Sequence, residues 1–111
     1  MESSPIFTKT YELIVWLNPL LTRFPKDQRF RMAKRIEDSL FSFHENLLRA
    51  SQHKERHPYL LEADHELEKM RVYLRLSMDM GWIKFNQYEN GGKMLTEIGK
   101  LLGGWIKAGL G

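Results

Sequence analysis

One predicted helix ends and the next begins within the segment Phe24-Pro25-Lys26-Asp27-Gln28-Arg29-Phe30-Arg31-Met32-Ala33-Lys34-Arg35-Ile36. Proline has no N–H to donate and discourages helical geometry in the residue before it, so we place the start of the second helix at about Pro25. From there the apolar side chains recur at helical spacing into the early fifties. This predicted core face comprises Met32, Ala33, Ile36, Leu40, Phe43 and Leu47.

The same segment concentrates positive charge. The chain has 111 residues, 17 Lys and Arg residues and a net charge of +3, yet a single acid, Asp27, accompanies six cations between positions 23 and 35. Such a charge run is either an ordinary solvated helix face or a site for an anionic partner. The six are Arg23, Lys26, Arg29, Arg31, Lys34 and Arg35.

Three further helices follow from the apolar periodicity. The first is predicted to run from about Pro5 to Phe24, and we expect Pro19 to kink it without breaking it because the apolar period continues. The third begins at His57-Pro58. Its seam follows a heptad that predicts the interior of a bundle. The seam residues are Leu60, Ala63, Leu67, Met70, Leu74, Ser77 and Gly81.

The fourth helix is predicted to open at Asn86, with Glu89 completing a capping box. Within it Gly99 and Gly103 would let another backbone approach closely. No stretch alternates with the period of two that is typical of a strand. Four helices with short connections predict one all-α domain over residues 1–111, an antiparallel up-down four-helix bundle, with flexible residues at about 1–5 and 108–111.

The third helix carries a second apolar patch opposite its seam. A lone domain in water rarely exposes such a patch, so we predict that a neighbouring subunit covers it, the alternative being a loop or the C-terminal tail. Arg71 and Arg75 flank the seam and are either ordinary ion pairs with Glu68 or Asp79, or part of a groove for an anion. The predicted oligomer interface comprises Val72, Tyr73, Leu76 and Met80.

No pattern in the chain predicts catalysis or a metal site. There is no Gly-x-Ser-x-Gly elbow, and Gly91-Gly92-Lys93 lacks the rest of a phosphate-binding loop. The histidines His53, His57 and His65 lack a recognised ligand spacing. We therefore predict a protein that is not an enzyme and has no cofactor or metal. The candidate carboxylates are expected to project outward: Glu37, Asp38, Glu45, Glu66 and Glu68.

Composition suggests where the protein works. The absence of cysteine favours a reducing cytoplasm. The start of the chain does not read as a signal peptide, and no stretch approaches the roughly 20 apolar residues that span a membrane. No aromatic residue is expected on the basic face, so we predict that any nucleic acid bound there is read through its phosphates.

Several motifs together resemble one family. They are Trp16-Leu17-Asn18-Pro19-Leu20, Phe24-Pro25-Lys26-Asp27-Gln28-Arg29-Phe30, Leu67-Glu68-Lys69-Met70-Arg71 and Glu97-Ile98-Gly99-Lys100-Leu101-Leu102-Gly103-Gly104-Trp105. The chain resembles the accessory variability determinant of diversity-generating retroelements. That group is similar to the four-helix proteins encoded in intervening sequences of bacterial 23S ribosomal RNA genes.

The resemblance implies a four-helix protomer that assembles into a pentameric barrel. It further implies binding to RNA, and possibly DNA, together with association with a reverse transcriptase that makes mutagenised complementary DNA. Alternatives are a protein of the ribosomal RNA intervening-sequence type or an oligomeric protein-interaction scaffold. Carried over to this chain, the nucleic-acid-binding residues would be Arg29, Arg31, Lys34, Arg35, Arg71 and Arg75.

Overall fold

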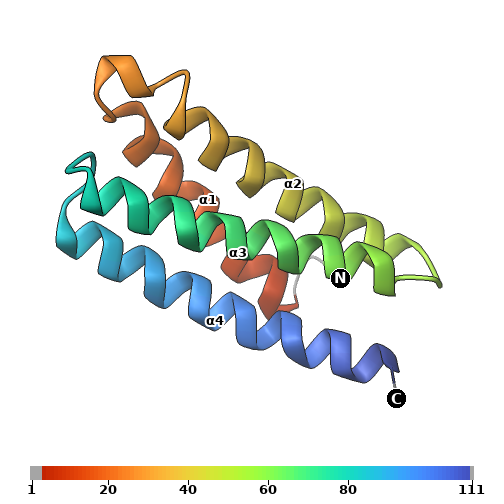
Figure 1. Ribbon diagram of the computed structural model, residues 1–111. Helices are drawn as coiled ribbons and strands as arrows, with labels where there is room; N and C mark the ends of the chain where they lie inside the picture. The colour runs from red at the N-terminus through yellow and green to blue at the C-terminus, as the bar shows by residue number, and fades with distance from the viewer. Residues whose placement is uncertain (1–3, 111) are drawn as a thin grey trace.

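The computed structural model describes residues 4–110 and shows an antiparallel four-helix bundle (Figure 1). Each helix lies beside two neighbours in the cyclic order α1–α2–α3–α4, and within the described residues the backbones of the diagonal pairs do not approach each other closely. No strand occurs in this part of the chain, so the predicted fold class is confirmed. The elements are α1 (Pro5–Thr22), the short 3-10 helix η1 (Lys26–Gln28), α2 (Met32–Gln52), α3 (His57–Asp79) and α4 (Phe85–Leu110).

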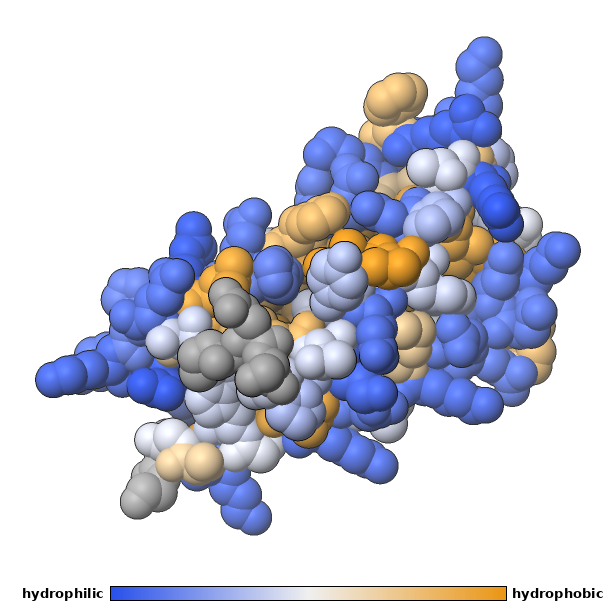
Figure 2. Space-filling view, turned by 180° about the vertical axis from the view of Figure 1, so that it is seen from behind, coloured by the Kyte–Doolittle hydropathy of each residue, from blue (hydrophilic) through white to orange (hydrophobic). Residues whose placement is uncertain are grey.

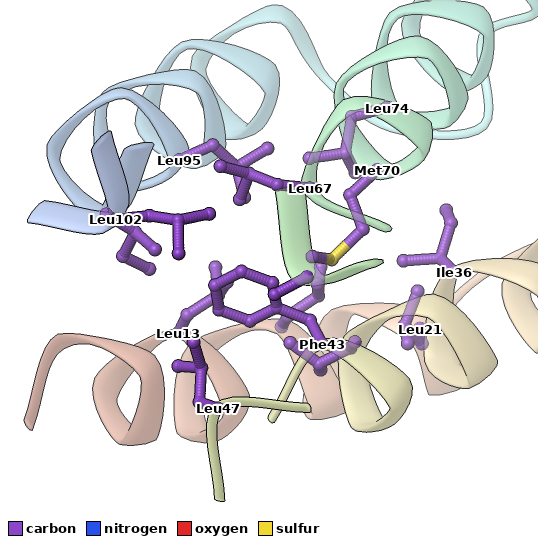
Figure 3. Close-up of a cluster of buried hydrophobic side chains, with 14 of the residues drawn as sticks. Leu13, Leu21, Ile36, Phe43, Leu47, Leu67, Met70, Leu74, Leu95 and Leu102 are labelled. Carbon is purple, nitrogen blue, oxygen red and sulfur yellow. The ribbon is translucent and has the colours of Figure 1, made fainter. Parts of the chain in front are cut away.

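Side chains from all four helices meet along the bundle axis (Figure 3). Leu13, Phe43, Met70 and Leu102, one from each helix, are completely buried. The apolar face predicted for the second helix is buried throughout, and so is the seam of the third helix as far as Ser77. Burial of these faces stabilises the bundle because it removes apolar surface from water.

Helix α1 begins and continues as predicted. Pro5 occupies its first turn, and the carbonyl of Ser4 accepts hydrogen bonds from the backbone N–H groups of Phe7 and Thr8, each at 3.1 Å. Pro19 lies inside the helix, which runs on to Thr22. Packing of the apolar face on both sides of Pro19 offsets the missing backbone hydrogen bond.

The prediction that the second helix starts at about Pro25 was wrong. Residues 23–31 form an elbow of one 3-10 turn and an irregular segment, and α2 begins only at Met32. Arg31, immediately before it, has φ −115° and ψ −94°, which is not helical. The elbow offers no apolar side chain to the core between Pro25 and Met32, since Phe30 is 88% exposed. Nothing apolar therefore holds a helix against the bundle there.

The connection between α3 and α4 also differs from the prediction. Helix α3 ends at Asp79, and Gly81 has φ +77°, a left-handed conformation that favours glycine, so Gly81 does not continue the seam. Helix α4 begins at Phe85, one residue before the predicted Asn86. Its first turn is capped by Gln87, whose Oε1 accepts the backbone N–H of Lys84 at 2.8 Å. The capping side chain is therefore Gln87 and not Asn86.

Helix α4 continues to Leu110 and includes residues 108–110, which were predicted to be flexible. Of the other residues predicted to be flexible, Pro5 begins α1 and Ser4 precedes it, whereas residues 1–3 and 111 lie outside the described part of the chain. Between residues 4 and 110 no helix combines the length and apolarity that crossing a membrane requires.

Candidate nucleic-acid interface

The six predicted nucleic-acid-binding residues are all exposed, but they lie on different elements: Arg29 and Arg31 in the elbow, Lys34 and Arg35 on α2, and Arg71 and Arg75 on α3. Arg29 and Lys34 line a pocket of about 470 Å³ between α1 and α2, together with Pro19 and Glu37. Arg29 Nε donates a hydrogen bond to the carbonyl of Phe24 at 3.1 Å, which fixes the guanidinium group against the elbow. The structure thus brings Arg29 and Lys34 together in one shallow pocket.

Lys34 is partly neutralised by an acid on its own helix. Its Nζ lies 2.7 Å from Asp38 Oδ1, one turn later, and both side chains are more than half exposed. The hydrogen bond to Asp38 raises the pKa of Lys34 above its usual value. An exposed pair of this kind contributes little to stability and is readily exchanged for a phosphate contact.

Arg35 faces the opposite flank of α2. It lines a pocket of about 250 Å³ between α2 and α3, which we call the Glu66 pocket. Three residues of α3 line the same pocket: Glu66, Tyr73 and Lys69, a cation that was not predicted to take part. An aromatic side chain therefore does lie beside part of the basic cluster, contrary to the prediction. The pocket is lined by Arg35, Asp38, Ser39, Ser42, Glu66, Lys69 and Tyr73.

Glu66 does not project outward as predicted. It is only 7% exposed, and its Oε2 accepts a hydrogen bond from Ser42 Oγ at 3.2 Å. Lys69 Nζ lies 3.0 Å from Glu66 Oε1, and this short polar contact raises the pKa of Lys69. The burial of Glu66 could have been predicted from the sequence, because Glu66 adjoins Leu67 and precedes Met70 by one turn on the buried side of the helix.

Arg71 and Arg75 lie on α3. Arg71 Nη2 donates a hydrogen bond of 3.4 Å to the carbonyl of Leu95 on α4. A Cβ atom added to Gly99 would lie 2.5 Å from the same Nη2. Gly99 therefore makes room for the guanidinium group of Arg71. The sequence analysis had predicted that it would make room for another backbone. Arg75 Nε lies 3.6 Å from Asp79 Oδ2, so both arginines already have partners within the chain.

Three of the four residues predicted to form an oligomer interface are on the surface. Val72, Leu76 and Met80 are 55%, 41% and 57% exposed and follow one another at intervals of four residues, the first two on α3 and Met80 immediately after its end. Tyr73 is instead half-buried against the core and lines the Glu66 pocket. The exposed apolar strip is therefore Val72, Leu76 and Met80.

A second apolar surface, not predicted, lies on α1. Tyr11 and Val15 are more than half exposed, and with Trp16 and Pro19 they line a groove of about 580 Å³, which we call the α1 groove. Figure 2, which views the molecule from behind, shows hydrophobic side chains gathered in the middle of this side between hydrophilic flanks. The sequence did contain a signal for this surface: α1 has only two charged residues, Lys9 and Glu12, so much of its outer face is uncharged.

Nothing in residues 4–110 brings together three or more His, Asp or Glu side chains in a way that could hold a metal ion. The chemistry that the described surface offers is therefore that of dispersed cations, one buried carboxylate and two apolar surfaces. These suit the binding of a polyanion and of protein partners.

A family model described as bAvd-like matches residues 5–109. Among solved structures, the chain is similar to a protein of unknown function from the S23 ribosomal protein family of Bacteroides thetaiotaomicron VPI-5482, at 28% sequence identity and a TM-score of 0.84. The match covers 92% of this chain and 98% of the other. No match is found among curated proteins. Neither matching family is a family of enzymes.

Proposed function

Because the chain belongs to the bAvd-like family, we propose that it is a non-enzymatic, cytoplasmic accessory protein of a diversity-generating retroelement. In this role it binds RNA, and possibly complementary DNA, through a basic surface and associates with a reverse transcriptase. The observation that carries the proposal is the elbow and first turn of α2, where Arg29, Arg31, Lys34 and Arg35 are all exposed. Exposed cations bind phosphates with little desolvation cost, which suits a polyanionic partner.

The binding should weaken steeply with salt. Phosphate contacts release condensed counterions, so about three contacts should lower the affinity for single-stranded RNA by at least about tenfold between roughly 50 and 200 mM salt. Fluorescence anisotropy with a labelled single-stranded RNA, repeated with DNA of the same sequence, measures this. An affinity that is independent of salt would contradict binding through the phosphates.

We further propose that the protein is a homo-oligomer, for which the resemblance implies five copies. Its support is the presence of two different exposed apolar surfaces, the strip on α3 and the α1 groove, which two copies would bury by a head-to-tail contact. In a ring of five, the net charge of +3 per chain becomes about +15 and multiplies the phosphate contacts.

Changing Leu76→Lys should produce smaller particles, because a charge placed in a buried apolar contact would remain unpaired. Static light scattering gives the particle mass. Leu61→Lys is the matched control, since Leu61 lies on the same helix and is 49% exposed but is outside the strip. If Leu76→Lys leaves the mass of an oligomeric parent unchanged, the strip on α3 is not the interface.

A second candidate function is that of an oligomeric protein-interaction scaffold. The α1 groove favours it, because an apolar groove on a helix face suits another protein's helix. Co-purification with a reverse transcriptase encoded beside this gene, with and without nuclease treatment, separates the candidates. A complex that survives nuclease, formed by a protein that does not bind RNA at low salt, would favour the scaffold.

A further inference from the structure

Phe30 is an aromatic residue of the elbow that the core does not use. Its exposed fraction is 88%, whereas Phe24, at the start of the same elbow, is 1% exposed. A single exposed apolar side chain is common on protein surfaces, so its exposure alone indicates no function. The backbone that carries Phe30 and the charges on either side of it give the exposure a meaning.

The backbone around Phe30 is held in place. The N–H of Arg31 donates a hydrogen bond to the carbonyl of Gln28 at 3.2 Å, and the Gln28 side chain is 7% exposed. Phe24 packs against Trp82, in the connection between α3 and α4, with ring centroids 6.4 Å apart. The elbow therefore presents the Phe30 ring at a defined place on the surface, and a ligand that binds there orders little additional chain.

The charges beside Phe30 are predominantly positive. Arg29 and Arg31 flank it in the chain, and both are exposed. Arg29 also lines, with a second cation, the pocket of about 470 Å³ between α1 and α2. Glu37 lines that pocket too, but Asp27 is the only acid among the six cations of the charge run. The elbow thus combines one exposed aromatic ring with an excess of positive charge.

Single-stranded nucleic acid matches both features. Proteins that bind it combine a basic surface, which follows the phosphates, with aromatic side chains on which unpaired bases stack. A double helix would use the cations only, because its bases already stack on one another. A protein partner would have to surround an apolar contact with acidic side chains. The charge of the elbow therefore favours a single strand as the occupant.

We propose that the Phe30 ring stacks on an unpaired base of single-stranded nucleic acid while Arg29 and Arg31 contact the neighbouring phosphates. This inference rests on the proposed nucleic-acid binding and assigns one residue to the bases. Every base has a flat face, so the contact adds affinity for single strands without selecting a sequence. Binding by the cations alone would not distinguish a strand with bases from one without them.

The test compares two labelled strands by fluorescence anisotropy at low salt: a single-stranded RNA, and a strand of the same length whose riboses carry no bases. The parent protein should bind the RNA about tenfold more tightly, as expected for one stacked base. Phe30→Ala should lose this difference and bind the abasic strand as the parent does, because the net charge is unchanged. Phe30→Leu, which is apolar but not aromatic, should behave like Phe30→Ala, and Phe30→Trp should keep the difference.

Phe41→Ala is the matched control. It removes the same side chain from the middle of α2, where the ring is 37% exposed, and it should keep the difference between the two strands. Circular dichroism should give Phe30→Ala the melting temperature of the parent, since a side chain that is 88% exposed adds little to folding.

Equal binding of the two strands by the parent overturns the inference and leaves the proposed function standing, as does a difference that survives in folded Phe30→Ala. Failure of the parent to bind either strand at low salt overturns both. Phe30→Ala could also keep the parent's affinity for RNA but no longer co-purify with the reverse transcriptase after nuclease treatment. The ring would then contact protein, and the inference would be overturned as well.

Discussion

Replacing Arg31, Lys34 and Arg35 together by glutamate should lower the affinity for single-stranded RNA by about 100-fold or more at roughly 100 mM salt. The change removes three exposed cations and adds three anions, which lowers the net charge by six units from +3. Because all three side chains are exposed and, within residues 4–110, only Lys34 of the three has an ion-pair partner, the bundle should stay folded. Fluorescence anisotropy measures the affinity, and circular dichroism checks the fold.

The matched control places the same charge change on another face. Lys93, Lys100 and Lys107 lie along α4, are all exposed, and can be changed together to glutamate. Electrostatic attraction depends partly on total charge, so this control should lose some affinity, but much less if the elbow and first turn of α2 contact the phosphates. Equal losses in the two triple variants would show that no particular face binds the nucleic acid.

Phe43→Ala should lower the free energy of unfolding by about 3–5 kcal/mol, a large share of the roughly 5–15 kcal/mol typical of a folded protein. The Phe43 ring is completely buried and lies among side chains of the other helices, so the bundle cannot collapse fully around the space it leaves (Figure 3). Urea denaturation followed by circular dichroism gives the difference.

Phe41→Ala is the control for this prediction. It removes the same side chain two residues earlier on α2, where the ring is 37% exposed, and it should cost clearly less. A similar loss in both variants would mean that Phe43 does not hold the helices together as the packing indicates.

The bundle could be predicted because helical periodicity and burial agree. Ile36, Leu40 and Phe43 recur at the spacing of one helix face, and all three are completely buried. The start of α2 could not be predicted, because Pro25 is compatible with both an α-helix and a 3-10 turn. Which one forms depends on what the following side chains can contact, and between Pro25 and Met32 no apolar side chain reaches the core.

The candidate site was harder to predict because neighbours in sequence are separated in space. Successive helix residues differ by about 100° in direction, so Lys34 and Arg35 line pockets on opposite flanks of α2. Conversely, Arg35 lines the same pocket as Lys69 and Tyr73, which are far away in the chain. Such a pairing depends on how α2 and α3 are rotated against each other, and the apolar period of either helix alone specifies this only coarsely.

Pro19 has an effect beyond the shape of α1. Since proline carries no N–H, the carbonyl oxygen of Val15 lacks its usual donor within the helix, and Val15 is 56% exposed beside the α1 groove. The α1 groove thus combines apolar side chains with one carbonyl oxygen that has no donor within the helix, and a partner that binds there has to suit both. An exposed carbonyl that lacks its helical donor is usually satisfied by water. A protein that binds in the α1 groove therefore gains most if it donates a hydroxyl or amide proton at that point and also buries apolar side chains.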